Sequence, residues 1–401
     1  METVVKQKMK VMEGSIGIAE IVAKCRPDVI SAYPITPQTH IVEALSKIVA
    51  DGRLKAECIK VDSEHSAASA CVGASVAGAR TYTATTAQGL LLMVEVLFSM
   101  AGMRLPVVLT GVNRTISSPL GIWNDHQDTM TVRDSGWIQL FAEDNQEAID
   151  MHIQAYKIAE KVLIPVMVCM DGFLLTHTFE PLEVYEQEQV DKFLPPFKPE
   201  YFLDTKNPHT FGCFAEPDKY TEFRYMFAQA HMDAKKEIIS VAKEFKESFG
   251  RFSGDVIEDY KCADADMVLV GMGSIVSVLK AAADEYRAQG KKVGVCKIRC
   301  YRPFPQEELA ALLANKKEIV VFDKSISIGL GSIVGSDLKE ALYGKSNAKI
   351  STAIIGMGGR DITVDSIKEV LAKNEKQTIN GEFVQLNRDI LPDNFAKKGG
   401  N

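Results

Sequence analysis

The sequence lacks the cysteine patterns that hold iron–sulfur clusters, zinc or disulfide frameworks. Its eight cysteines are scattered, no C-x-x-C pair occurs, and the two closest are Cys296 and Cys300. An iron–sulfur cluster needs four thiolates at short spacings, so we expect no cluster on this chain. Most of the cysteines fall in apolar runs such as PVMVCMD, where a free thiol packs as a small hydrophobic side chain. We therefore expect reduced, structural cysteines.

Histidine is scarce and the common glycine-rich motifs are missing. The seven histidines show no paired spacing, which argues against a zinc site, and we expect no metal ligands. There is no G-x-x-x-x-G-K-[ST], no G-x-S-x-G and no G-x-G-x-x-G after a strand-like run. These absences remove the usual sequence signals for P-loop nucleotide binding, serine hydrolysis and dinucleotide binding.

No long apolar run and no strong excess of charge is present. The most apolar stretch, residues 89–103, is interrupted by Glu95 and is shorter than the ~20 residues that a membrane span needs. The start, METVVKQKMKV, has no apolar segment, so we expect no signal peptide and a cytoplasmic protein. With 46 Lys and Arg against 53 Asp and Glu, the net charge of −7 favours neither nucleic acid nor an anionic membrane as a partner.

The composition is that of an ordinary globular protein. Strand patterns and helix patterns alternate along the sequence. The chain has 401 residues, 46% of them hydrophobic and 25% charged, which suggests two or three domains. Short runs rich in β-branched residues predict strands, and amphipathic segments between them predict helices. Such alternation is typical of a doubly wound, mostly parallel sheet with helices on both faces. The strands are expected at 29–34, 57–62, 80–85, 105–112 and 164–171, and the helices at 39–49, 63–79, 87–102 and 146–161.

The alternation stops at Gly172 and resumes after residue 255. Residues 172–220 are expected to be irregular because they include Pro181, Pro195, Pro196, Pro199 and Pro208, and an amphipathic helix is expected at 220–249. We divide the chain into a first domain (1–255), a smaller α/β domain (256–375) and a polar tail (376–401) that lies on a partner or stays loose. The second domain is expected to contain strands at 266–271, 292–298, 318–322 and 349–354, and helices at 275–288, 306–313, 335–342 and 364–372.

Ligands of open parallel sheets bind at the carboxyl ends of the strands, so the residues that follow each strand are the first candidates. The segment YPITPQT (33–39) follows the first predicted strand. Thr36 and Pro37 there suit the start of a helix, as N-cap and first helical residue. A hydroxyl and free N–H groups at a helix start also suit a carboxylate or a phosphate, and both roles remain open.

Two charged residues follow the next strands. Glu64 lies in SEHSA at a predicted helix start, where an acid favourably faces the helix dipole; alternatively, it serves a bound heteroaromatic ring beside the small-residue helix that follows. Arg114 follows a buried strand and needs an anion, either a structural partner or a substrate carboxylate. The loop after it, with Trp123 and His126, has the polar composition of a lid or of a solvated loop.

Taken in order, YPITPQT, SEHSA, NR and IWNDHQD resemble the alpha subunits of the multi-subunit pyruvate:ferredoxin oxidoreductases (pyruvate synthases), within the 2-oxoacid:ferredoxin oxidoreductase family. The resemblance covers nearly the whole chain, and WNDHQD followed by RDSGWIQL is specific to the pyruvate-type members. It implies a thiamine-diphosphate-binding first domain and a second domain like the C-terminal domain of transketolases. Glu64 then matches the glutamate that contacts N1′ of the thiamine pyrimidine, Thr36 and Arg114 match the residues that hold the pyruvate carboxylate, and Tyr33 and Pro34 line the cofactor.

The resemblance also implies partners. The chain lacks the G-D-G…N-N run that binds Mg²⁺ and the diphosphate, so a beta subunit is expected to supply that half of the site. Gamma and delta subunits are expected to carry the [4Fe-4S] clusters and the coenzyme A site, with ferredoxin as electron acceptor. The implied reaction is the reversible oxidative decarboxylation of pyruvate to acetyl-CoA and CO₂. The alternatives are a sibling enzyme for phenylglyoxylate, a branched-chain oxo acid or 2-oxoglutarate, and a non-catalytic assembly subunit.

Overall fold

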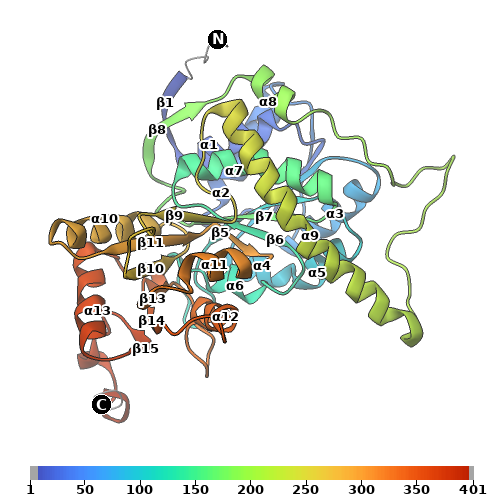
Figure 1. Cartoon of the computed structure of the whole chain (residues 1–401). Helices are drawn as coiled ribbons and strands as arrows, with labels where there is room; N and C mark the ends of the chain where they lie inside the picture. Colours follow the sequence, from blue (N-terminus) through green and yellow to red (C-terminus); the bar gives the residue numbers. More distant parts are fainter. Residues whose placement is uncertain (1–7, 397–401) are drawn as a thin grey trace.

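The computed structural model describes residues 8–396, which form two mainly parallel sheets with helices on both faces of each (Figure 1). The first sheet has the order β12-β6-β7-β5-β4-β2-β3, and every neighbouring pair is parallel except β12 with β6. The predicted α/β class is therefore confirmed. The strands are β2 (Val29–Ser31), β3 (Glu57–Ile59), β4 (Thr81–Thr85), β5 (Val108–Asn113), β6 (Ile138–Phe141), β7 (Val166–Asp171) and β12 (Cys300–Arg302).

The central strands are apolar on both faces because helices cover both faces. Along β7, Val168 and Met170 point into one hydrophobic core, whereas Met167 and Cys169 point into another. Figure 1 shows the long α9 crossing the first of these two faces. The first core is completed by α1 (Gly14–Lys24), α2 (Thr39–Ala50), α7 (Asn145–Val162), α8 (Gln187–Phe193) and α9 (Pro217–Phe249), and the second by α3 (Glu64–Val76), α4 (Ala87–Leu92), α5 (Val94–Gly102) and α6 (Gln127–Thr131).

The second sheet has the order β15-β14-β13-β10-β11-β9, with β9 antiparallel to β11 and the other pairs parallel. One face packs against α10 and α13, and the other against α11 and α12. Its elements are β9 (Ile257–Tyr260), β10 (Met267–Gly271), α10 (Ile275–Ala288), β11 (Val293–Ile298), α11 (Gln306–Leu313), β13 (Glu318–Asp323), α12 (Ile333–Leu342), β14 (Lys349–Ile354), α13 (Val364–Lys376) and β15 (Asn380–Phe383).

The two sheets share a core and exchange a strand. Met167 of the first sheet and Val270 and Cys296 of the second lie in the same hydrophobic cluster. The chain also leaves the second sheet at Ile298 and enters the first as β12 at Cys300. The proposed division at residue 255 stays a prediction, but strand order does not follow it, because β12 belongs to the first sheet.

Several local expectations are wrong. The tail was expected to lie on a partner or stay loose, but its first part does neither. There β15 pairs with β14 and extends the second sheet. The segment 172–220 contains α8 and also β8 (Phe179–Val184), which pairs with β1 (Lys8–Glu13). The helix expected at 87–102 breaks at Met93 into α4 and α5. Short elements complete the description: 3-10 turns at Met357–Gly359 and Arg388–Ile390, and α14 (Asp393–Ala396).

The cysteines are unpaired, as expected, and Cys213 is the exposed one among them. Among the helices of residues 8–396, none combines the length and apolar character required to cross a bilayer.

Candidate active site at the carboxyl edge of the first sheet

Four neighbouring strands of the first sheet end at one edge, and the candidate residues follow those ends. Thr36 follows β2, Glu64 follows β3, the first turn of α4 follows β4, and Arg114 follows β5. Because these strands are parallel and adjacent, their carboxyl ends bring the four segments to the same side of the sheet.

Glu64 is a buried acid whose carboxylate has no partner within the chain. It is the first residue of α3, follows the N-cap Ser63, and is 7% exposed. The cap is made by Ser63, whose hydroxyl accepts from the N–H of Ser66 at 3.2 Å. Within residues 8–396, no hydrogen bond or ion pair reaches the Glu64 carboxylate. The carboxylate oxygens are therefore available to accept a hydrogen bond from a donor brought by a ligand.

Gly89 makes room for that carboxylate. A Cβ at residue 89 would lie 2.6 Å from Oε1 and 2.8 Å from Cγ of Glu64, both closer than real contacts allow. It would also lie 2.6 Å from Oγ1 of Thr85. The bare backbone of α4 therefore faces the acid directly, and sequence analysis missed this role. A glycine inside the apolar helix AQGLLL was the available signal.

Buried polar atoms without partners gather beside this contact. The hydroxyls of Thr85 and Thr86 and the amide nitrogen of Gln88 are shielded from solvent and have no hydrogen bond among the described residues. All three groups lie where β4 passes into α4. The hydroxyls of Thr81 and Thr83 within β4 are also buried and have no partner among the described residues. Buried polar groups are normally paired, so this concentration fits a site that a polar ligand completes.

Arg114 is buried without a counter-ion. Its side chain is 6% exposed, its Nη1 donates to the carbonyl of Thr36 at 2.8 Å, and its Nε donates to the carbonyl of Gly121 at 3.0 Å. Among residues 8–396, no carboxylate forms an ion pair with Arg114. No acceptor in this part of the chain receives a hydrogen bond from its Nη2. Burial lowers the pKa of Arg114, while the charge of Asp128 opposes this effect. The structural ion pair considered above therefore has no partner here, and Nη2 is available to an external anion.

Asp128 joins Arg114 to the start of α4. Its Oδ2 accepts the backbone N–H groups of Ala87 at 2.9 Å and Arg114 at 3.0 Å, while Oδ1 accepts from the side chain of Asn113 and the N–H of Thr129. Burial raises the pKa of Asp128 to about 7, against the lowering effect of these donors. The carboxyl thereby fixes the helix that faces Glu64 relative to the loop that carries Arg114.

The Thr36 segment is held by Gln38 rather than by a helix cap. Helix α2 begins at Thr39 with Gln38 in the N-cap position, so the expected cap by Thr36 with Pro37 in the first helical position is wrong. The buried Gln38 amide donates to the carbonyls of Tyr33 at 3.1 Å and Ala84 at 2.6 Å, which ties the segment to β4. The Thr36 hydroxyl is consequently free to meet a ligand.

Tyr33 and Pro34, the two expected cofactor-lining residues, are exposed at the start of this segment. The structure thus joins Thr36 and Arg114 directly, and connects Arg114 through Asp128 to the helix that packs on Glu64. It places Tyr33 and Pro34 beside the carboxyl end of β2, the strand that Thr36 also follows.

Residues 124–128 are part of the junction between the two sheets, so the lid interpretation is wrong for them; Trp123 is 53% exposed, and a lid role for its part of the loop stays a prediction. His126 is 1% exposed, and its Nε2 lies 3.1 Å from Oδ1 of Asp171. Asn124 accepts from the ammonium of Lys324 at 2.9 Å, and the N–H of His126 donates to the carbonyl of the same lysine. A lid must move, whereas this loop is bonded to both sheets.

Two family models match the chain. The model for the thiamine-diphosphate-binding domain of pyruvate flavodoxin/ferredoxin oxidoreductases matches residues 20–243. The model for core domain II of pyruvate:ferredoxin oxidoreductase matches residues 265–367. The two regions correspond to most of the residues that build the two sheets.

Relatives of known name are similar over almost the full chain. The pyruvate synthase subunit PorA of Methanosarcina barkeri is 50% identical over 96% of this chain and 98% of its own length. The ketoisovalerate oxidoreductase subunit VorA of Pyrococcus horikoshii is 46% identical over 93% of this chain and 95% of its own length. The two relatives are named after different oxo acids, although their sequence identities to this chain are similar.

A solved structure has a similar fold. It is the 2-oxoglutarate:ferredoxin oxidoreductase of Magnetococcus marinus with 2-oxoglutarate, coenzyme A and succinyl-CoA bound. The TM-score is 0.70 at 19% sequence identity, over 92% of this chain. The present chain spans 65% of the length of that chain.

Proposed function

Because the chain belongs to the pyruvate flavodoxin/ferredoxin oxidoreductase family, we propose that it is the alpha-type subunit of a thiamine-diphosphate-dependent pyruvate:ferredoxin oxidoreductase. The proposed reaction is the reversible oxidative decarboxylation of pyruvate to acetyl-CoA and CO₂, with electrons passed to ferredoxin. We assign it to the cytoplasm, where coenzyme A and ferredoxin are available.

The observation that carries this proposal is the unpaired, buried Glu64 carboxylate against the bare backbone of Gly89. Its surroundings fit the aminopyrimidine of thiamine diphosphate, a flat ring with a nitrogen that can share a proton with an acid. When bound, that cofactor supplies the nucleophilic carbon and the electron sink needed to decarboxylate a 2-oxo acid. Glu64 holds the proton at the ring nitrogen N1′, and Tyr33 and Pro34 line the ring. The unpaired hydroxyls of Thr85 and Thr86 add polar groups at the same place.

Arg114 and Thr36 bind the substrate carboxylate. The Arg114 guanidinium is fixed by the carbonyls of Thr36 and Gly121, so its direction is set before substrate arrives. Its free Nη2 and the free Thr36 hydroxyl then orient the carboxylate, which brings the keto carbon to the cofactor. Asp128 acts as a positioning residue, because it holds the backbone of Arg114 and the start of α4 together.

Partner subunits supply what this chain does not carry. We assign the Mg²⁺ and diphosphate ligands to a beta subunit, because the metal-binding run is missing from the sequence. We assign the [4Fe-4S] clusters and the coenzyme A site to gamma and delta subunits. The scattered, mostly buried cysteines of this chain are consistent with that division.

A branched-chain oxo acid is the second candidate substrate, because relatives of nearly equal identity carry either name. Comparing kcat/KM for pyruvate and for 3-methyl-2-oxobutanoate in the assembled enzyme decides between them. A higher value for the branched acid would replace pyruvate in this proposal and leave the assigned residues unchanged.

The central test is Glu64→Gln in the assembled enzyme. Glutamine keeps the size but cannot share a proton with N1′, so we expect turnover to fall ~10²–10⁴-fold with subunit assembly and cluster content unchanged. Hydrogen–deuterium exchange at the thiazolium C2 of bound cofactor should fall in parallel. Glu95 is an exposed acid in the first turn of α5, and Glu95→Gln is the matched control with no expected effect. Wild-type exchange in the Glu64 variant would return Glu64 to a helix-start acid.

A further inference from the structure

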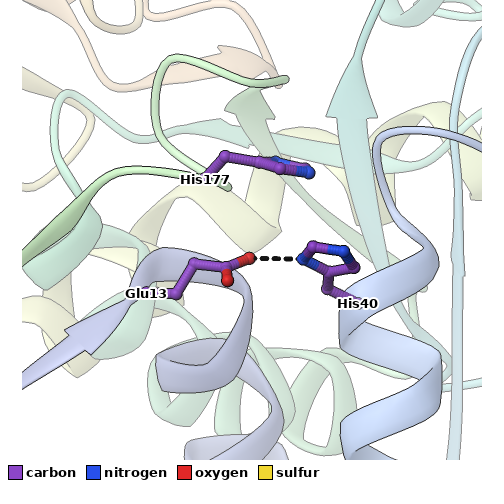
Figure 2. A group of neighbouring side chains, drawn as sticks. All are labelled: Glu13, His40 and His177. Atoms are coloured by element: carbon purple, nitrogen blue, oxygen red, sulfur yellow. Dashed lines mark hydrogen bonds and ion pairs between the residues drawn. The ribbon is translucent and has the colours of Figure 1, made fainter.

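Three potential metal ligands that are distant in sequence converge outside the candidate active site. Glu13 ends β1, His40 lies in the first turn of α2, and His177 lies in the loop after β7. Figure 2 shows the three side chains directed toward one another. One ligand atom from each can be chosen so that all three lie within 4.8 Å of one another. We call these residues the Glu13–His40–His177 cluster.

The donor set suits a divalent transition-metal ion. Two imidazoles and one carboxylate form a common three-ligand set for zinc, which leaves a fourth position for water. Ligand atoms around tetrahedral zinc, with bonds of about 2.0–2.1 Å, are separated by about 3.3 Å. Oε1 of Glu13 already lies 2.7 Å from Nδ1 of His40, and the two imidazole centroids are 4.6 Å apart. Shifts of about 1.5 Å or less would form the site.

The side chains can make such shifts, since none is locked in a packed core. The side chains of Glu13 and His40 are 12% and 44% exposed, and His177 is half-buried. Metal binding replaces the proton that Glu13 and His40 share in their hydrogen bond. The cluster is thus accessible to an ion from solvent.

His177 is oriented in the way that metal-binding histidines usually are. Its Nδ1 lies 2.8 Å from the hydroxyl oxygen of Thr176, and that oxygen also accepts the N–H of Phe173 at 2.8 Å. In the tautomer in which Nδ1 donates, the lone pair is on Nε2. Burial and the neighbouring His40 lower the pKa of His177, which Glu13 partly opposes.

We propose that Glu13, His40 and His177 bind one divalent transition-metal ion of the zinc class. The ion ties together the start of α1, the first turn of α2 and the loop after β7. Because α2 begins three residues after Thr36, the ion also steadies the segment that carries Thr36. This inference does not depend on the proposed reaction.

The test uses the full chain after chelator treatment. Titration with zinc against a chromophoric chelator should give one ion per chain, and Co²⁺ should give the visible spectrum of a four-coordinate nitrogen–oxygen site. His40→Gln and His177→Gln should each weaken binding at least tenfold, with Glu13→Gln between them and the wild type. Zinc at a hundred times its Kd should shift the unfolding equilibrium of the wild type about a hundredfold.

Two controls separate this cluster from other ligands. His209→Gln and Cys213→Ser change a partly exposed imidazole that packs against Tyr201 and the exposed thiol, and both variants should bind zinc as the wild type does. The proposal is overturned if no stoichiometric binding occurs, if binding survives both cluster histidine substitutions, or if it is lost with Cys213. Repeating the titration on the assembled enzyme tests whether the site persists there.

Discussion

Lys324 and Asp171 form an ion pair of 2.9 Å at the junction between the two sheets, with side chains that are 2% and 0% exposed. Asp171 ends β7 of the first sheet, and Lys324 directly follows β13 of the second. Burial alone would raise the pKa of Asp171, but Lys324, His126 and Ser274 hold it far below its ordinary value. The two sheets are therefore joined by a desolvated charge pair as well as by apolar packing.

Replacing Lys324 by methionine leaves Asp171 buried without its main counter-charge. We expect Lys324→Met to lower the free energy of unfolding by about 3–5 kcal/mol, measured by denaturant titration. Lys317→Met is the matched control, because its pair with Asp266 is 74% and 52% exposed and is expected to contribute less than about 1 kcal/mol. Equal losses of unfolding free energy in the two variants would show that the buried ion pair stabilises the fold no more than the exposed pair does.

Adding a methyl group at Gly89 should displace the Glu64 carboxylate. The new Cβ would lie 2.6 Å from Oε1, so the acid has to rotate away, and misplacement of about 1 Å typically costs ~100-fold in rate. We expect Gly89→Ala to lose activity to that extent while the chain stays folded.

Gly73 provides the control for that experiment. A Cβ there meets nothing within 4 Å, so Gly73→Ala should retain activity and gain about 0.4–1 kcal/mol in stability. Steady-state assays of both variants in the assembled enzyme make the comparison. Full activity in the Gly89 variant would mean that the position of Glu64 is not critical.

Arg114→Lys should weaken substrate use by removing the planar guanidinium. Lysine keeps the charge but loses the planar fork whose Nη1 and Nε are fixed by the Thr36 and Gly121 carbonyls while Nη2 faces a carboxylate. The loss of one charged hydrogen bond costs ~1.5–3 kcal/mol, so kcat/KM for the oxo acid should fall roughly ten- to a hundredfold. Arg133→Lys, a partly exposed arginine that contacts the Met130 carbonyl, should be neutral. If the Arg114→Lys variant matches the kinetics of the wild type, Arg114 does not hold substrate.

His152 should make the chain less stable in mild acid. It is fully buried, with hydrogen bonds of 2.6 Å to the Ala148 carbonyl and the Thr110 hydroxyl, and burial lowers its pKa to about 4. Below the unfolded pKa of about 6.5 the unfolded chain binds a proton that the folded chain does not. The contribution of His152 is therefore present above pH 6.5 and is lost at about 1.4 kcal/mol per pH unit down to pH 4.

The check is the pH slope of unfolding free energy between about pH 7 and pH 5. His152→Gln should reduce that slope relative to the wild type, even if its stability at neutral pH is lower. His209→Gln, which removes a partly exposed imidazole outside this core, should leave the slope unchanged. Identical slopes in all three proteins would contradict the assignment.

Sequence patterns predicted the fold where local signals are strong. The β-branched runs that become β4, β5 and β7 are buried on both faces, so their composition alone marks them as central strands. The pattern failed for β6 and β12, which have four and three residues and owe their strand form to neighbours in the sheet. Short strands of this kind are determined by tertiary contacts.

The candidate site residues were likewise predictable where a local sequence signal marks them, and not where their role depends on tertiary contacts. Thr36, Glu64 and Arg114 were found because strand ends can be located from sequence, and their roles stay proposals. The part played by Gly89 depends on contact with a residue from another helix, and the burial of His126 depends on Asp171. The Glu13–His40–His177 cluster combines residues that no local pattern connects.

The crossing of β12 into the first sheet constrains how the chain is synthesised and how it can be cut. Its neighbour β6 ends at Phe141, whereas β12 begins at Cys300, so the edge of the sheet stays open on the ribosome until residue 302 has emerged. A fragment ending at residue 255 would keep that edge permanently unpaired, and unpaired edges recruit strands from other molecules. Expression of residues 1–255 alone should accordingly give aggregates, whereas fragments extended past Arg302 retain the covering strand.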